Sequence, residues 1–197
     1  MNSIVLSGFM CCGKTTAGQK LSSRTGLDFY DLDAEIEKKM NAPVPEIFRD
    51  WGEKVFREQE AAILRSLCTK QCVIAAGGGA FADSKNYGTV KLSSGFVVFI
   101  DTPFEICYKR ILRDSGRPLA EGKTREEMLE LYNTRRALYE KNCDAVVSGN
   151  APSLLIIAEI MQEVVRLIDE KTGAEIDQIN DNAEEKNAEE KIAEEKI

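Results

Sequence analysis

The pattern G-x-x-x-x-G-K-[ST] constrains this chain more than any other feature of its sequence. Residues 8–15, GFMCCGKT, match it at every fixed position. A β-branched and aliphatic run at 3–7 precedes the pattern, and helical spacing begins at about Lys14. In such a loop the glycines let backbone N–H groups converge on phosphate oxygens, and the helix N-terminus adds a positive dipole end. The sequence therefore predicts a site for a nucleoside triphosphate, with Lys14 at the β- and γ-phosphates and Thr15 at Mg²⁺.

Strands and helices are expected to alternate along the rest of the chain. Short aliphatic and aromatic runs predict strands, and apolar residues at helical spacing predict helices. The expected strands lie at 3–7, 27–30, 73–76, 96–100 and 145–147. The expected helices begin at about residue 14 and then cover 34–40, 46–50, 53–68, 104–112, 125–141 and 152–168. This alternation is typical of an α/β fold with a central parallel sheet covered by helices on both faces.

The length of 197 residues suits one compact domain, and the net charge of −7 is unevenly placed. Residues 169–197 hold eleven acidic and four basic residues, so the rest of the chain is neutral. Ala-Glu-Glu-Lys recurs there with a period of five, which rotates apolar positions by about 140° per repeat and forms no stripe. We therefore expect a domain over 1–173 and an acidic, low-complexity, disordered tail over 174–197, whose composition favours solvation over docking.

Composition excludes several classes of protein. The chain has no histidine, which excludes His-ligated metals and Ser-His-Asp triads. It has no apolar run of the roughly 18–20 residues that cross a membrane, and the neutral body has no basic excess for nucleic acid. The first residues carry no secretory pattern, and the six cysteines form no C-x-x-C pair. We therefore expect a cytoplasmic protein with reduced thiols. Apart from this argument, we also expect a monomer.

Two carboxylates, Asp31 and Asp33, follow the second expected strand. Ligands bind at the carboxyl ends of the strands in open parallel sheets. One carboxylate near Mg²⁺ and one near an acceptor hydroxyl would suit phosphoryl transfer to an alcohol. Asp33 also precedes a helix, and Asp is a good N-cap, so a capping pair is an equal alternative.

Arg57 lies on a helix between Glu53, four residues before it, and Glu60, three residues after it. Both carboxylates fall on the face of the arginine and can orient its guanidinium. An oriented guanidinium is a bidentate receptor for a carboxylate. The alternative is a ladder of exposed ion pairs.

Three further features lie downstream. The glycines at 77–79 follow a strand and permit either close backbone approach to a ligand or a flexible turn. Arg117 lies in the polar stretch 113–123, where it is either a lid arginine for transferred phosphate charge or a solvated loop residue. Arg135 and Arg136 are either anion contacts or an exposed pair.

In their order and spacing, these features resemble the shikimate kinase family over about residues 3–168. The matching segments are the loop at 8–16, Asp31-x-Asp33, Gly52-Glu53-x-x-Phe56-Arg57, Gly77-Gly78-Gly79, Arg117-Pro118-Leu119 and Arg135-x-x-Leu138-Tyr139. The phosphate loop is generic, whereas GExxFR followed by GGG and RPL is more specific. The resemblance implies a P-loop kinase with a lid loop that phosphorylates the 3-hydroxyl of shikimate with ATP and Mg²⁺. The products would be shikimate 3-phosphate and ADP, in the biosynthesis of chorismate and aromatic amino acids.

The resemblance also implies roles for individual residues. Lys14, Asp33 and Arg117 would be catalytic, with Asp33 engaging the acceptor hydroxyl, and Asp31 would hold Mg²⁺ through water beside Thr15. The implied nucleotide contacts are Gly8, Met10, Cys11, Cys12, Gly13, Lys14, Thr15, Thr16, Arg110, which would stack on adenine, and Arg117. The implied shikimate contacts are Asp33, Arg57, Gly77, Gly78, Gly79 and Arg135, with Phe48 and Phe56 as walls of the pocket.

Two positions depart from the pattern of the family. Cys11 stands where glycine is usual, and a positive φ there would cost cysteine roughly 1–2 kcal/mol of backbone strain and weaken phosphate binding. The pair Cys11-Cys12 is either reactive or inert, and inert packing is favoured. Ala137 replaces the usual proline of Arg-x-Pro-Leu-Tyr, so Arg136 competes with Arg135 for the ligand-facing position, although register favours Arg135.

Other functions are open to the same scaffold. A kinase for another small hydroxy acid, such as gluconate, would share the loop, and the set Asp33, Arg57 and Arg135 distinguishes it from the leading hypothesis. A nucleoside monophosphate kinase fits the GExxFR segment poorly. A non-catalytic nucleotide-binding regulator would keep the loop, but every polar group that the transfer needs is present here.

Overall fold

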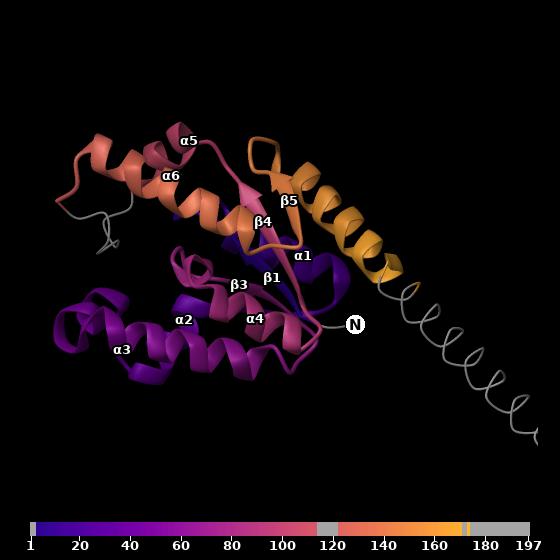
Figure 1. Ribbon diagram of the computed structural model, residues 1–197, viewed down its shortest axis with the longest axis horizontal. Coiled ribbons are helices and arrows are strands. Elements are labelled where there is room, and N and C mark those ends of the chain that lie inside the picture. Colours follow the sequence, from indigo (N-terminus) through magenta and orange to yellow (C-terminus); the bar gives the residue numbers. More distant parts are fainter. Residues whose placement is uncertain (1–2, 114–121, 171–172, 174–197) are drawn as a thin grey trace, which may run out of the picture. The chain divides into compact units, whose positions relative to one another are not determined.

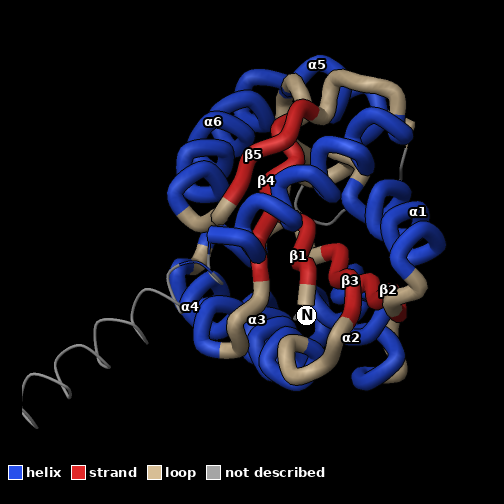
Figure 2. The backbone as a smooth tube through the Cα atoms, turned by 90° about the vertical axis from the view of Figure 1, so that its right-hand side faces the viewer, coloured by secondary structure: helices blue, strands red, loops and turns tan. Residues whose placement is uncertain are grey.

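The computed structural model describes residues 3–113, 122–170 and 173. Within this part of the chain, five strands form one sheet in the order β2-β3-β1-β4-β5 (Figure 2). Figure 1 labels β1, β3, β4 and β5 of this sheet. The strands are β1 (Ile4–Ser7), β2 (Asp28–Asp31), β3 (Cys72–Ala75), β4 (Phe96–Asp101) and β5 (Ala145–Ser148). All neighbouring strands run parallel, so their carboxyl ends lie at one edge of the sheet. The predicted α/β class with a parallel sheet is confirmed.

Helices cover both faces of this sheet. The helical elements are α1 (Lys14–Thr25), α2 (Leu32–Met40), α3 (Val44–Leu67), the 3-10 turn η1 (Ala80–Ala82), α4 (Ser84–Leu92), α5 (Phe104–Ile111), α6 (Arg125–Lys141) and a segment at 153–170. α1 packs on β1, β2 and β3, whereas α4 and α6 pack on β4. Figure 2 shows α1 on one side of the sheet and α4 and α6 on the other.

The central strands are buried because both of their faces are covered. Every residue of β1 and of β3 is buried, whereas the residues of the edge strand β2 are half-buried or exposed. Parallel strands of this kind read as continuous apolar runs rather than as an alternation. The loops that follow β1 and β3 therefore begin on a rigid base, at the edge where the candidate site lies.

Two elements differ from the sequence-based expectation. The helices expected at 46–50 and 53–68 belong to one element, α3, which is interrupted at Gly52 by a non-helical φ of 80° and ψ of 165°. α4 was not expected, because its sequence, SKNYGTVKL, contains a glycine and has no clear apolar face. Its N-terminus is capped by the Asp83 carboxylate, which accepts a hydrogen bond from Lys85 N.

The chain divides into two compact units, Met1–Ile160 and Met161–Ile197. The sheet and the candidate site belong to the first unit. The tail expected at 174–197 and Arg117, which is expected to lie in a lid, are outside the described residues. Among the described helices, none is long and apolar enough to cross a membrane.

Candidate active site

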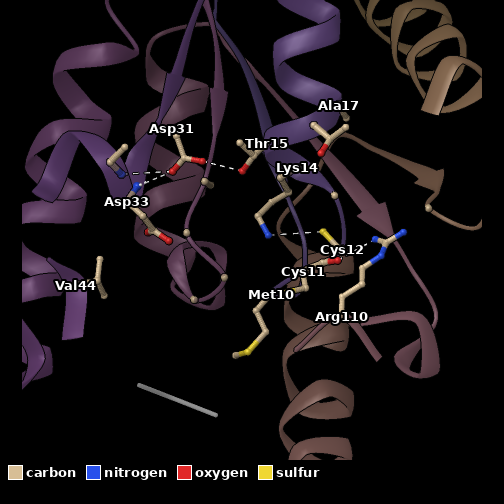
Figure 3. A pocket seen from close by; sticks show the side chains of 18 of the residues that line it. Met10, Cys11, Cys12, Lys14, Thr15, Ala17, Asp31, Asp33, Val44 and Arg110 are labelled. Atoms are coloured by element: carbon tan, nitrogen blue, oxygen red, sulfur yellow. Dashed lines mark hydrogen bonds between the residues drawn. The ribbon is translucent and has the colours of Figure 1, made fainter. Parts of the chain in front are cut away.

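A cavity of about 870 Å³ opens at the carboxyl ends of the strands (Figure 3). It is lined by the loop between β1 and α1, the start of α2, one face of α3, the segment after β3 and single residues of α5 and α6. The sequence-predicted site residues that line it are Met10, Cys11, Cys12, Gly13, Lys14, Thr15, Thr16, Asp31, Asp33, Phe48, Phe56, Arg57, Gly77, Gly78, Gly79, Arg110 and Arg135. Segments far apart in the sequence therefore share one cavity.

The loop between β1 and α1 is held by glycines and by one buried lysine. Gly8 has a φ of 141°, and a Cβ there would lie 2.8 Å from the carbonyl oxygen of Ile100, so only glycine fits. Lys14 Nζ donates to the carbonyls of Gly8 and Phe9 at 2.9 and 2.8 Å. The lysine side chain therefore folds back over its own loop, with its ammonium at the place where phosphate oxygens are expected.

Cys11 has a φ of 59°, which is the positive value that the missing family glycine would readily adopt. Its carbonyl oxygen accepts a 2.9 Å hydrogen bond from Arg110 Nη1 (Figure 3). The guanidinium expected to stack on adenine therefore also holds the phosphate loop from α5. The adenine contact itself stays a prediction.

Asp31 joins the loop to the second strand. Its Oδ2 accepts a 2.8 Å hydrogen bond from Thr15 Oγ1, and its Oδ1 accepts from the backbone N–H groups of Asp33 and Ala34. The capping alternative therefore holds for Asp31, which is the cap of α2, and is wrong for Asp33. Because α2 begins at Leu32, Asp33 lies in the first turn of the helix and lines the cavity.

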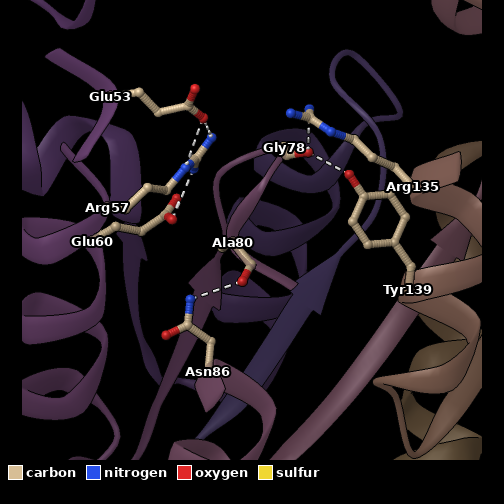
Figure 4. A network of polar contacts seen from close by, with 8 residues as sticks. All are labelled: Glu53, Arg57, Glu60, Gly78, Ala80, Asn86, Arg135 and Tyr139. Atoms are coloured by element: carbon tan, nitrogen blue, oxygen red, sulfur yellow. Dashed lines mark hydrogen bonds and ion pairs between the residues drawn. The ribbon is translucent and has the colours of Figure 1, made fainter. Parts of the chain in front are cut away.

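Arg57 is held by two carboxylates on its own helix, as the spacing predicts (Figure 4). Its guanidinium lies 2.9 Å from Glu53 and 2.9 Å from Glu60. The alternative of an exposed ladder is wrong for the pair with Glu60, whose side chain is only 1% exposed, whereas the Glu53 side chain is 52% exposed. Burial raises the pKa of Glu60 to about 7, an effect that Arg57 opposes and Asp33 reinforces.

The glycines at 77–79 are required by close approach rather than by flexibility. A Cβ on Gly77 would lie 2.6 Å from Asp33 Oδ1 and 2.6 Å from Glu60 Oε1. A Cβ on Gly79 would lie 2.5 Å from Arg57 Nη2. Glycine at these positions therefore leaves room for the carboxylates of Asp33 and Glu60 and for the guanidinium of Arg57.

The two adjacent arginines of α6 face different partners. Arg135 Nη1 donates to the carbonyl of Gly78 at 2.9 Å, and Arg135 lines the cavity (Figure 4). Arg136 instead forms a bidentate pair with Asp101, with Nε 3.0 Å from Oδ1. Of the two, Arg135 is the residue available to a ligand in the cavity.

Within the described part of the chain, oxygens suitably placed for a cation lie at the phosphate loop. Among the described residues, no group of three or more Asp, Glu, Cys or His side chains could hold a metal ion. Thr15 Oγ1 and Asp31 Oδ2 are hard oxygens that lie side by side at the phosphate loop. This donor set fits Mg²⁺, which takes one or two protein oxygens together with phosphate oxygens and water.

Sequence reasoning missed part of the cavity wall. Gly149, Ala151, Ser153 and Ile156 line the cavity from the segment after β5, where no motif marks them. Glu37 and Val44 line it near α2 and α3, and Val44 N donates to Glu37 Oε1 at 2.8 Å. These residues carry no charge pattern or spacing that a single sequence would distinguish.

Comparisons with known proteins agree with this geometry. A family model described as shikimate kinase matches residues 10–169. Shikimate kinase from Persephonella marina is 36% identical over 165 residues, covering 83% of this chain and 99% of that protein. Shikimate kinase from Aquifex aeolicus is 38% identical over 159 residues, covering 80% of this chain and 93% of that protein.

Solved structures give the same result. Shikimate kinase from Acinetobacter baumannii in complex with shikimate is 33% identical, with a TM-score of 0.77 over 87% of this chain and 94% of that one. A gluconokinase from Sinorhizobium meliloti is 14% identical, with a TM-score of 0.57 over 86% of this chain and 95% of that one. At that identity, the second likeness concerns the fold alone.

Proposed function

This chain belongs to the shikimate kinase family, and we propose that it transfers the γ-phosphoryl group of ATP to the 3-hydroxyl of shikimate. The products are shikimate 3-phosphate and ADP, in the route to chorismate and the aromatic amino acids. One observation carries the proposal: a single cavity joins a phosphate loop to a carboxylate and two guanidinium groups. This combination suits a small acceptor that carries both a hydroxyl and a carboxylate.

The loop side of the cavity binds the nucleotide. Backbone N–H groups at the start of α1 and the Lys14 ammonium receive the phosphates. Thr15 and Asp31 would hold Mg²⁺, which when bound neutralises charge on the β- and γ-phosphates. Arg110, which lines the cavity from α5, contacts the adenine side.

The opposite side of the cavity binds the acceptor. Arg57 and Arg135 grip the carboxylate of shikimate, and Phe48 and Phe56 wall the pocket, with ring centroids 4.8 Å apart. Asp33 accepts a hydrogen bond from the 3-hydroxyl and takes its proton as the oxygen attacks. Catalysis rests on positioning and on charge neutralisation, to which Arg117 contributes from the lid.

We also propose that the protein acts in the cytoplasm as a monomer without a nucleic-acid partner. The neutral charge of residues 1–168 supports the part of this proposal that concerns nucleic acid. Size-exclusion chromatography with light scattering at micromolar concentration measures the oligomeric state directly.

The test is the release of ADP from ATP and Mg²⁺ with either shikimate or gluconate as the acceptor. We expect ADP release that depends on shikimate and not on gluconate, with phosphorus NMR placing the phosphate on the 3-oxygen. Lys14→Ala and Asp33→Asn should each reduce turnover by ~10²-fold or more, because each removes charge stabilisation or proton transfer from the transition state.

A control variant separates catalysis from a general loss of charge. Lys39→Ala removes one exposed ammonium from α2 and should keep the wild-type rate. Turnover with gluconate and not with shikimate would replace the acceptor in the proposal. If neither acid stimulates ADP release, while ADP still binds, the proposed reaction is wrong and a nucleotide-binding role remains.

A further inference from the structure

Two carbonyl groups of the phosphate loop accept hydrogen bonds from side chains that lie far away in the sequence. The carbonyl oxygen of Cys12 accepts a 2.9 Å hydrogen bond from Thr102 Oγ1, and that of Cys11 accepts one from Arg110 Nη1. Thr102 directly follows β4, is 2% exposed and does not line the cavity. A buried side chain, 90 residues away in the sequence, therefore fixes the orientation of the Cys12–Gly13 peptide.

This contact determines where the next N–H group points. In a trans peptide, the C=O and the N–H lie on opposite sides of the bond that joins them. When Thr102 holds the Cys12 carbonyl on the buried side, the N–H of Gly13 is turned toward the opposite side, where the cavity lies. That N–H stands immediately before α1, where the dipole of the helix adds to its attraction for an anion.

The threonine is itself fixed by its surroundings. Its carbonyl accepts a 3.0 Å hydrogen bond from the hydroxyl of Tyr132 on α6. A Cβ on Gly149 would lie only 1.8 Å from Thr102 Oγ1, so glycine at 149 leaves the space that the hydroxyl occupies. Gly149, directly after β5, therefore leaves space for the Thr102 hydroxyl, and Tyr132 of α6 holds the Thr102 backbone.

We infer that Thr102 is a positioning residue for the nucleotide phosphates, acting through the Cys12 carbonyl on the Gly13 N–H. The inference deepens the proposed function and rests on it only in taking the ligand to be a nucleotide. Without the hydroxyl, the Cys12 carbonyl loses its buried partner, and the peptide turns to satisfy it elsewhere. The Gly13 N–H is then no longer aimed at the phosphates.

The test compares Thr102→Val, which keeps the shape and removes the donor, with Thr102→Ser, which keeps the donor. Calorimetry with ADP and with adenosine separates the phosphate contribution from that of the base. We expect Thr102→Val to bind ADP about five- to tenfold more weakly, as for one lost hydrogen bond to an orienting group. Adenosine binding and the KM for shikimate should change less than about twofold, and Thr102→Ser should restore ADP binding.

A matched control tests for a merely structural role. Tyr132→Phe also removes one buried hydrogen bond at Thr102, but it leaves the bond from Thr102 Oγ1 to the loop in place. We expect it to lower thermal stability as much as Thr102→Val without weakening ADP binding. If both variants weaken ADP equally, or if Thr102→Val binds ADP like the wild type, the inference is wrong.

Two further provisions keep the outcome clear. If Thr102→Val does not fold, Thr102→Ala removes the same donor without adding a methyl group against the Cys12 carbonyl, and it takes over the comparison. ADP binding is measured without an acceptor. A failure to phosphorylate shikimate would therefore contradict the proposed function and would not affect this inference. Conversely, if the enzyme is active and both Thr102→Val and Thr102→Ala bind ADP like the wild type, only the inference is wrong.

Discussion

Thr15 Oγ1 donates a 2.8 Å hydrogen bond to Asp31 Oδ2, and this contact joins the first turn of α1 to the end of β2. The other oxygen of the same carboxylate caps α2. The Asp31 side chain therefore caps α2 and also places an oxygen beside the phosphate loop. Because the cap fixes the carboxylate, the pair of oxygens is in position before a cation binds.

Asp31→Asn should separate these two tasks. Asparagine caps helices about as well as aspartate, so we expect little change in thermal stability. It lacks the negative charge, so the Mg²⁺ concentration for half-maximal turnover should rise by about tenfold, in the range known for supporting carboxylates. The measurement is a Mg²⁺ titration of turnover at fixed ATP and shikimate.

The control for this titration is Asp28→Asn, which removes the same charge from the exposed start of β2. It should leave the Mg²⁺ dependence unchanged. An Asp31→Asn enzyme that saturates at the wild-type Mg²⁺ concentration would contradict a metal role for Asp31.

Glu60 should make the stability of the protein depend on pH. Its pKa is raised by burial from 4.5 to about 7, so the folded state binds this proton more tightly than the unfolded state. The contribution of Glu60 to the free energy of unfolding is therefore full below about pH 4.5 and falls as the pH rises to about 7. Urea unfolding of the wild type and of Glu60→Gln at several pH values measures it as their difference. We expect the wild type to lose about 1–3 kcal/mol relative to the variant across this window. A constant difference would contradict the raised pKa.

The same carboxylate should affect acceptor binding. Above about pH 7 the ionised Glu60 fixes the Arg57 guanidinium at 2.9 Å, and the neutral amide of Glu60→Gln does so less well. We expect the KM for shikimate to rise by roughly five- to tenfold in this variant, with the KM for ATP unchanged. Glu58→Gln, on the exposed face of the same helix, is the matched control. Equal KM values for shikimate in wild type and Glu60→Gln would show that Arg57 needs no second carboxylate.

Tyr139 should position the second guanidinium. Its hydroxyl and Arg135 Nη1 both donate to the carbonyl of Gly78 (Figure 4). Its ring packs on Phe99. Burial raises the pKa of Tyr139, so the hydroxyl stays protonated and continues to donate. Tyr139→Phe keeps the ring and frees the Gly78 carbonyl to move, and we expect the KM for shikimate to rise by about three- to tenfold.

Tyr87→Phe is the comparison for this effect. It also removes one tyrosine hydrogen bond, from Tyr87 to Asp144 at 3.0 Å, but neither residue lines the cavity. Both variants should lose about 1 kcal/mol of stability, as for one hydrogen bond. Only Tyr139→Phe should change the KM for shikimate, and equal KM values in the two variants would refute the positioning role.

The parts of the site that the sequence predicts well are those defined by local pattern. The loop at 8–15 lies between a strand and a helix because apolar runs and glycines specify that geometry over a few residues. The spacing of Glu53, Arg57 and Glu60 on one helix likewise predicts their contact. The burial of Glu60 could not be predicted, because it depends on how α3 packs against other elements. This burial raises the pKa of Glu60.

Tertiary contacts account for the remaining differences. The choice between Asp31 and Asp33 as the cap depends on α2 beginning at Leu32, and helix boundaries are poorly defined by pattern alone. Arg135 and Arg136 are adjacent, and only the packing of α6 assigns one to Gly78 and the other to Asp101. Thr102 belongs to no motif, and its contact with the loop spans 90 residues.

Cys11 should carry measurable backbone strain. Its φ of 59° is costly for a residue with a Cβ, by roughly 1–2 kcal/mol. Glycine avoids this cost but loses more chain entropy on folding, by roughly 0.5–1 kcal/mol. We therefore expect Cys11→Gly to raise the free energy of unfolding by up to about 1 kcal/mol, measured by urea unfolding under reducing conditions.

Cys11→Ala isolates the strain from the chemistry of the thiol, because it removes the sulfur and keeps the Cβ. It should gain no stability, and its difference from Cys11→Gly measures the backbone term alone. Arg110 binds the carbonyl of residue 11, which all three proteins share, so the loop should keep its shape. ADP binding by Cys11→Gly should then equal or exceed that of the wild type. If glycine and alanine at position 11 give equal stability, the strain at the positive φ is no greater than the roughly 0.5–1 kcal/mol of chain entropy that glycine loses on folding.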